Sequence, residues 1–247
     1  MDNIRRASQS DIRQDPVVDD YANLQGPSLL KRTLGLQNHR HTRYIGDSTE
    51  YDATLLDLRL YEDGKAETLA DRGSFRKVTS NIFFHQFSDS ETPSHEREIE
   101  DLDSIERVVA PHGEALVKLY FRIVHPSFPI LHKKVFLEKY GRSHREFSPP
   151  LLAAVYALAL NWWSYSSELA GYPRPDIAKL EEVAFRALQD IAQRPKLSTV
   201  QAGLLLLQRP QSGARWLLTA QLVAMGQDLG LHMDPSNWQI PAWERGL

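Results

Sequence analysis

This 247-residue chain contains nine histidines, and their imidazole rings could bind a metal ion or exchange protons. His125 and His132 flank a Pro-Ser-Phe-Pro segment, His39 and His41 lie near the N-terminus, and His232 lies near the C-terminus. A metal site needs several of them to converge with carboxylates, and their spacing does not group them. We interpret them as polar residues at helix ends, where histidine suits the helix dipole.

Motifs for catalysis are absent from the sequence. It contains no Gly-x-Ser-x-Gly elbow, no Gly-x-Gly-x-x-Gly turn, no phosphate loop and no His-Glu-x-x-His helix. It also contains no cysteine, which excludes disulfides, thiolate zinc sites, iron–sulfur clusters and cysteine nucleophiles within this chain. We therefore expect that the chain is not an enzyme and holds no metal or other cofactor of its own.

The composition is that of an ordinary globular protein, with 42% hydrophobic and 25% charged residues. A formal net charge of −3 provides no global positive field for nucleic acid or an anionic membrane. No uncharged apolar run is long enough to span a bilayer, and the N-terminus lacks the apolar stretch of a signal peptide. We expect an intracellular protein without a membrane partner.

Residues 1–43 are rich in polar residues and show no sustained hydrophobic period, which predicts a disordered arm. Its last part is basic and contains no acid. One interpretation is a solvated linker, and the other is a nuclear-import signal or a patch that binds the DNA backbone. The residues of this candidate patch are Lys31, Arg32, Arg40 and Arg43.

Residues 44–106 have a mixed character that we interpret as an upstream segment followed by an acidic linker. Arg43–Gly46, Phe75–Val78 and the aromatic stretch Ile82–Phe87 favour a short β-ribbon. Residues 52–60 fit a helical turn instead. Acids dominate residues 89–106, which predicts a linker or a solvated helix end, and we place a domain boundary there.

Helical periodicity dominates after residue 106. We expect a mostly α fold: an irregular α-helical bundle with a loose N-terminal arm, to which a short β-ribbon is a possible addition. The sequence predicts a left-handed cap at Gly141, a capping box from Ser198 to Gln201, and a cap at Gly230 that folds Leu231 back on the last helix. The predicted helices are His112–His125, Lys133–Tyr140, Pro149–Trp163, Asp176–Gln193, a leucine-rich helix from Ser198, and Gly213–Leu229.

Several large aromatic residues in this half could line a pocket for a small effector between helices. The alternative is core packing with one tryptophan at the rim. The residues of this candidate pocket are Tyr156, Trp162, Trp163 and Trp216.

Four blocks in order resemble the fungal-specific transcription factor domain, the middle homology region of binuclear zinc-cluster regulators. Residues 120–132 and 148–156 resemble its opening, residues 195–207 its leucine-rich helix, and residues 216–232 its helix that ends in Asp-Leu-Gly-Leu-His. Residues 43–51 resemble a segment that precedes this domain in regulators of nitrogen and carbon use. The motif residues are His125, Pro126, Phe128, Pro129, Leu131, His132, Asp228, Leu229, Gly230, Leu231 and His232.

The resemblance implies a nuclear domain, residues 107–247, that regulates transcription of metabolic genes together with other transcription regulators or co-regulators. It implies DNA binding through a six-cysteine cluster with two zinc ions, which this cysteine-free chain cannot build. We therefore expect a fragment that lacks both ends of such a regulator. The alternative is a helical domain that binds a metabolite or a protein and has no DNA-binding activity. The sequence leaves the oligomeric state open.

Overall fold

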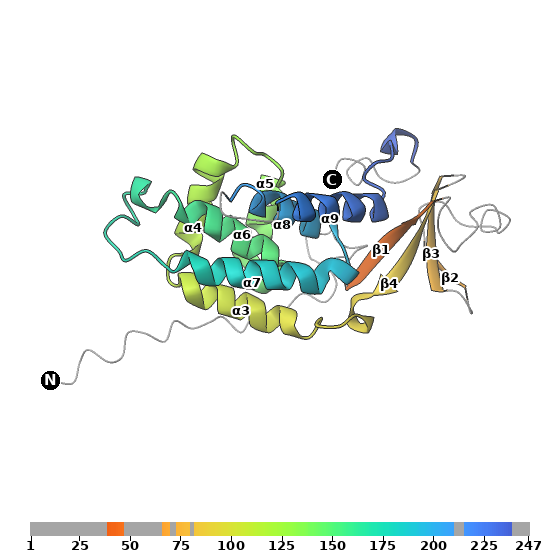
Figure 1. Ribbon diagram of the computed structural model, residues 1–247, viewed down its shortest axis with the longest axis horizontal. Coiled ribbons are helices and arrows are strands. Elements are labelled where there is room, and N and C mark those ends of the chain that lie inside the picture. Colours follow the sequence, from red (N-terminus) through yellow and green to blue (C-terminus); the bar gives the residue numbers. More distant parts are fainter. Residues whose placement is uncertain (1–38, 47–65, 70–72, 80–81, 210–214, 239–247) are drawn as a thin grey trace. The chain divides into compact units, whose positions relative to one another are not determined.

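The computed structural model describes residues 39–46, 66–69, 73–79, 82–209 and 215–238 (Figure 1). The chain packs as two compact units. Within the described residues, the first unit comprises 96–190 and 201–209, and the second comprises the residues up to 95, 191–200 and 215–238. Neither unit is one continuous stretch, so the boundaries predicted at residues 43 and 106 stay predictions.

The first unit is built around a central helix, α6 (Pro149–Leu160), of which every residue is buried. Its sequence contains no charged side chain, and a helix that is apolar all round is stable only in a protein interior. The helices α3, α4 and α7 pack on it. The other elements of this unit are α3 (Arg97–Val109), α4 (Gly113–Leu119), the π-helical turn η3 (Tyr120–Val124), α5 (Lys133–Arg142), the 3-10 turns η4 (His144–Glu146) and η5 (Trp163–Tyr165), and α7 (Ile177–Asp190).

Helix α3 contains residues 97–106 of the acidic stretch 89–106, for which the sequence suggested a linker or a solvated helix end. It buries Leu102, Ile105 and Val109 on one side, while Glu100 is exposed and Glu98 is partly exposed. The spacing of the three apolar residues is that of one helix face, so α3 is a packed helix. Its acid Asp101 is buried as well and forms an ion pair with Arg186.

The second unit contains a four-stranded antiparallel sheet in the order β1-β4-β3-β2. The strands are β1 (Arg40–Ile45), β2 (Ala66–Leu69), β3 (Gly73–Thr79) and β4 (Ile82–Ser88), and His41 lies opposite Phe87 in the register. Helix α8 (Leu197–Leu206) begins in this unit and ends in the first. The remaining elements are the 3-10 turns η2 (Asp89–Glu91), η6 (Ile191–Gln193) and η7 (Pro235–Asn237), and helix α9 (Arg215–Asp228).

The mostly α fold is confirmed, and the sheet is larger than the predicted ribbon. Two details are wrong. Gly141 lies inside α5 and has no left-handed conformation, because Lys139 and Arg142 continue the helix around it. The capping box is replaced by other bonds, since Thr199 Oγ1 accepts from the backbone N–H of Lys196 at 3.1 Å and Gln201 donates to the carbonyl of Ile130 at 2.8 Å.

Other predictions hold in part. Gly230 has φ +73° and ends α9 as predicted, and the N–H of Leu231 donates back to the carbonyl of Gly226 at 2.8 Å. Helix α6 ends at Leu160, before the predicted Trp163. The helical turn suggested for residues 52–60 lies outside the described residues.

A polar network in the first unit surrounds Gly113. The Tyr156 hydroxyl donates to Glu106 Oε2 at 2.8 Å and lies 2.9 Å from the Tyr140 hydroxyl. Burial, with the nearby Glu106 charge, raises the pKa of both tyrosines, so both keep their protons. A Cβ on Gly113 would lie 2.7 Å from Glu106 Oε1 and 2.7 Å from the Tyr140 hydroxyl. Only glycine therefore fits at the start of α4.

We expect Gly113→Ala to lower the free energy of unfolding by about 1–3 kcal/mol, because the added methyl group must separate hydrogen-bonded side chains. Urea denaturation measures the change. Gly141→Ala is the matched control: nothing lies within 4 Å of its Cβ, and alanine should stabilise α5 by about 0.5–1 kcal/mol. Equal effects of the two substitutions would contradict the account of Gly113.

Candidate functional site

The candidate site lies in the second unit, around strand β1. Side chains alternate between the two faces of a strand, so His41 and Arg43 share one face of the sheet and Tyr44 lies on the other. Each face is contacted by a segment that comes much later in the chain. The first face meets residues 191–200, and the second meets the residues that follow α9.

A buried carboxylate, Asp89, organises the first face. Its side chain is 3% exposed; the ring of His41 donates to Oδ1 at 3.0 Å and Lys196 Nζ donates to Oδ2 at 2.5 Å. Burial alone would raise the pKa of Asp89, but the hydrogen bond from His41 and the charge of Lys196 outweigh it and hold that pKa below its usual value. Asp89 is therefore an anion in the folded protein.

Arg194 adds a second attachment beside Asp89. Its side chain is buried and donates to Thr92 Oγ1 at 3.0 Å and to the carbonyl of Pro93 at 2.8 Å. The Thr92 hydroxyl in turn donates to the carbonyl of Asp89 at 2.6 Å. Together with Lys196, these bonds fix residues 191–200 to the turn that follows β4.

Stacked rings continue from His41 across the sheet. His41 stacks on Phe87 with ring centroids 5.3 Å apart, Phe87 meets His85 at 4.0 Å, and His85 stacks on Phe75 at 4.5 Å. Such stacked and tilted arrangements are favourable for aromatic rings. The row connects three strands and leaves His41 and His85 buried, where no substrate could reach them.

Arg43 lies at the edge of this face and is already engaged. It donates to the carbonyl of Gln193 at 3.2 Å, lies 3.5 Å from Asp228 and sits over the ring of Phe87 at 5.4 Å. Burial raises the pKa of Asp228, and Arg43 and His41 oppose that shift only in part. Arg40 is exposed, whereas Lys31 and Arg32 lie outside the described residues. The DNA-backbone or nuclear-import patch stays a prediction.

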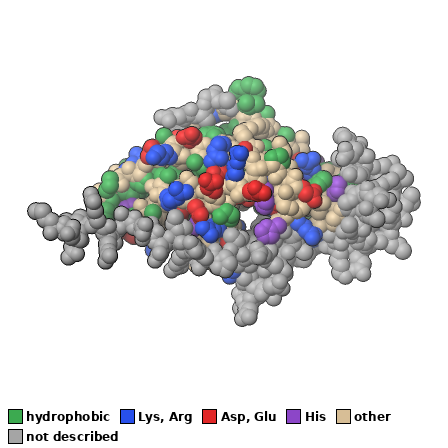
Figure 2. All heavy atoms as spheres, turned by 90° about the horizontal axis from the view of Figure 1, so that it is seen from below, with side chains coloured by type: hydrophobic (Ala, Val, Ile, Leu, Met, Phe, Trp, Pro, Cys, Tyr) green, Lys and Arg blue, Asp and Glu red, His purple; other side chains and the backbone are tan. Residues whose placement is uncertain are grey.

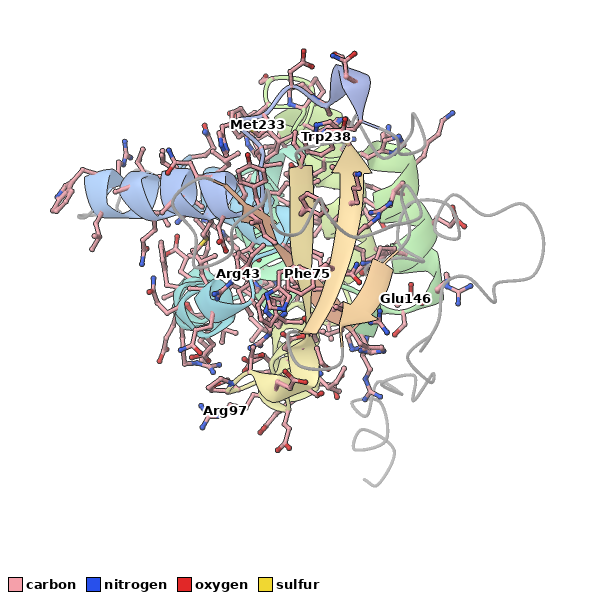
Figure 3. The ribbon with its side chains drawn as sticks, turned by 90° about the vertical axis from the view of Figure 1, so that its right-hand side faces the viewer. Arg43, Phe75, Arg97, Glu146, Met233 and Trp238 are labelled. Carbon is pink, nitrogen blue, oxygen red and sulfur yellow. The ribbon has the colours of Figure 1, made fainter. Side chains whose placement is uncertain are left out.

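The motif that ends α9 lies on the other face of the sheet. A Cβ on Gly230 would be 3.1 Å from the ring of Phe84 and 3.5 Å from Tyr44, so the left-handed glycine also allows a close approach. His232 meets Tyr44 edge to face at 5.5 Å, and Trp238 meets Phe84 at 5.6 Å. In Figure 3, Met233 and Trp238 lie near one end of the strands. The motif Asp228–His232 thus contacts strand β1, which contains the first residues of the family-like segment 43–51.

The remaining motif residues belong to the first unit and shape the turn before α5. The N–H of Val135 donates to His132 Nδ1 at 3.3 Å, which caps that helix, and Leu131 is buried. Burial, together with the charge of Lys133, lowers the pKa of His125. Pro126 and Pro129 are exposed, and Phe128 is partly buried. Leu229, a motif residue of the second unit, is also partly buried.

The aromatic residues of the predicted effector pocket have different surroundings. Tyr156 is buried in the network around Gly113, and Trp163 is buried with its N–H donating to the carbonyl of Tyr172 at 3.1 Å. Trp162 is 38% exposed. Trp216 belongs to the other unit and is 75% exposed. The pocket stays a prediction.

The described residues contain no group of three or more histidines and acids that could hold a metal ion. Among the helices that the structure describes, none has the length and apolarity needed to cross a bilayer. On the face shown in Figure 2, basic and acidic side chains are interspersed. What this arrangement can do is position chain segments through buried, mutually satisfied polar groups.

The class of protein follows from two features. One is a helical unit with a leucine-rich helix, and the other is a sheet that an Asp-Leu-Gly-Leu-His motif contacts; both belong to a regulatory domain of the kind that the sequence resembles. The family model described as the fungal specific transcription factor domain matches residues 117–246, and the chain belongs to this family.

Curated relatives agree with this family. The chain is 36% identical over 241 residues to the transcriptional activator protein DAL81 of Saccharomyces cerevisiae, a match that covers 93% of this chain and 25% of that protein. It is 38% identical over 138 residues to an uncharacterized transcriptional regulatory protein of Schizosaccharomyces pombe, covering 55% of this chain and 21% of that protein. The chain therefore spans about a quarter of the length of these relatives. No solved structure matches it.

The sequence did not reveal the Asp89 cluster. Asp89 lies in an acid-rich stretch whose sequence does not show which carboxylate is buried. Its partner Lys196 is 107 residues away in the chain. Residues 43–51 and 216–232 both resemble segments of the family, but the sequence does not predict that Tyr44 and His232 meet.

We expect Lys196→Met to lower the free energy of unfolding by about 3 kcal/mol, because it leaves the Asp89 carboxylate buried with less compensation. Asp89→Asn should lower the free energy of unfolding by less, since the Lys196 side chain is 32% exposed and its ammonium group can be solvated. The double variant should lower the free energy of unfolding by less than the sum of the two single effects. Arg43→Met is the control, as its half-exposed ion pair with Asp228 contributes at most about 1 kcal/mol. Additive effects at Lys196 and Asp89 would contradict this pairing.

The depressed pKa of Asp89 predicts a pH dependence. In the unfolded chain this pKa is near the ordinary aspartate value of 3.8, and in the folded chain it is lower. The stabilisation is therefore present above the unfolded value and is lost as pH falls through the folded value. As the pH is lowered below about 4, the urea midpoint should decrease. It should decrease less steeply with pH in Asp89→Asn than in the wild type. Parallel curves would show that the pKa of Asp89 is not depressed.

Proposed function

We propose that this chain is a regulatory region that acts in the nucleus on transcription by RNA polymerase II, and that it modulates metabolic genes without catalysing a reaction. The observation that carries the proposal is the state of the polar groups that the fold brings together. Asp89, His41 and Lys196 are satisfied by each other, and the imidazole is buried, so these groups serve to hold segments in place.

Membership of the transcription factor family gives this positioning role its context. We propose that the chain holds or releases the activity of a DNA-binding module in a longer regulator, through contacts with other transcription regulators or co-regulators. Zinc belongs to that module in this proposal, because zinc-cluster binding needs cysteine thiolates and this chain has none. Direct binding of DNA by this chain is not part of the proposal, in keeping with its net charge of −3.

We expect the chain, fused to an unrelated DNA-binding module, to change the output of a reporter gene severalfold relative to that module alone. Leu152→Asp should abolish the change, because it places a carboxylate in α6 at a position with 0% exposure. Leu137→Asp is the matched control at a position with 40% exposure and should behave as the wild type. A reporter that is indifferent to the chain in every nutrient condition would overturn the proposal.

A further inference from the structure

Residues 232–238 form a short segment after α9 that lies over the second face of the sheet, and we call it the strap. Beneath it, Val78 and Phe84 are buried, and Tyr44, Ile82 and Trp238 pack against them as a separate small apolar cluster. Trp238, the last residue of the strap, is the residue through which the strap packs against this cluster. The strap thus covers an apolar surface of the sheet with its own aromatic residue.

The start of the strap is fixed by a rigid helix cap. Two bonds characteristic of a Schellman motif close α9: the N–H of Gly230 donates to the carbonyl of Gln227 at 3.0 Å, and the N–H of Leu231 donates to that of Gly226 at 2.8 Å. Gly230 itself lies against Phe84. The cap holds the chain beside the sheet, and the strap continues from it.

The strap also has a local fold of its own. Asp234 Oδ1 accepts from the backbone N–H of Ser236 at 3.0 Å, and the N–H of Trp238 donates to the carbonyl of Pro235 at 3.0 Å. The N–H of Met233 donates to the carbonyl of Gly230 at 3.0 Å. These backbone bonds are made within the strap or to the cap, so they can persist when the strap leaves the sheet.

Among the described residues, the strap meets the sheet through aromatic rings. His232 meets Tyr44, and Trp238 meets Phe84 with ring centroids 5.6 Å apart. The Nε1 atom of Trp238 is buried and has no hydrogen-bond partner among the described residues. A buried N–H without a partner is unfavourable, and this penalty offsets part of the free energy that the indole gains by burial. The covered state therefore has a small free-energy advantage over the uncovered one.

We propose that the strap is a conformational device: it lifts from the sheet as a folded piece, while the sheet stays intact, and uncovers Val78 and Phe84. The occupant of this apolar surface is the chain's own strap, and Trp238 is its anchor. This inference deepens the proposed function, since a surface with a covered and an uncovered state gives a regulatory region the two-state element that a switch requires.

Thiol labelling tests the strap directly, because the chain has no cysteine of its own. Val78→Cys places a thiol under the strap at 2% exposure, and Val155→Cys places one in α6 at 0% exposure. Reaction with dithiodipyridine is followed by absorbance in the full chain. Local openings need less free energy than global unfolding, so Val78→Cys should react at least ~10-fold faster, with a rate that depends weakly on urea.

Two substitutions of the anchor complete the experiment. Trp238→Ala should accelerate labelling of Val78→Cys severalfold and leave Val155→Cys unchanged. Trp238→Phe keeps a ring on Phe84 and removes the unpartnered N–H, so labelling should be no faster than with tryptophan. Equal rates and equal urea dependence at the two thiols, or no response to Trp238→Ala, would overturn the strap. These outcomes are independent of the reporter assay, so the strap and the proposed function can fail separately.

Discussion

The buried carboxylate of Asp89 is the interaction on which the arrangement of the second unit depends. It receives Lys196 from the start of α8 and His41 from β1, and its own turn receives Arg194. A carboxylate that is 3% exposed is stable as an anion only when such partners surround it. These bonds hold residues 191–200 to the turn that follows β4.

The sheet turns this cluster into a platform with two different faces. One face is held by charges and by the row of rings from His41 to Phe75, and it is fully engaged. The other face is covered by the strap through ring contacts that include an unpartnered indole. A strongly attached face beside a weakly attached one is a suitable basis for regulation, because only the second can change its cover without loss of the fold.

The first unit has a different physical basis. Its central helix, α6, is entirely apolar, and the polar network of Tyr156, Tyr140 and Glu106 lies beside it with its hydroxyl groups satisfied. The fit around Gly113 shows how closely this network is packed. This unit is the helical core of a transcription factor domain, and the family of the chain is visible in the sequence because the leucine-rich helix and the motif residues follow in order along residues 117–246.

The sequence alone determined the helical class and the cap at Gly230, because helical periodicity and the tolerance of glycine for a positive φ are local properties. It also indicated three of the strands, but not that they join β2 in one four-stranded sheet of the order β1-β4-β3-β2. The tertiary structure alone decided that Asp89 is the buried acid, that Arg43 is bound to Gln193 and Asp228, and that α3 is a packed helix. Those outcomes depend on burial and on partners far apart in the chain, and no local pattern distinguishes one carboxylate or arginine from its neighbours.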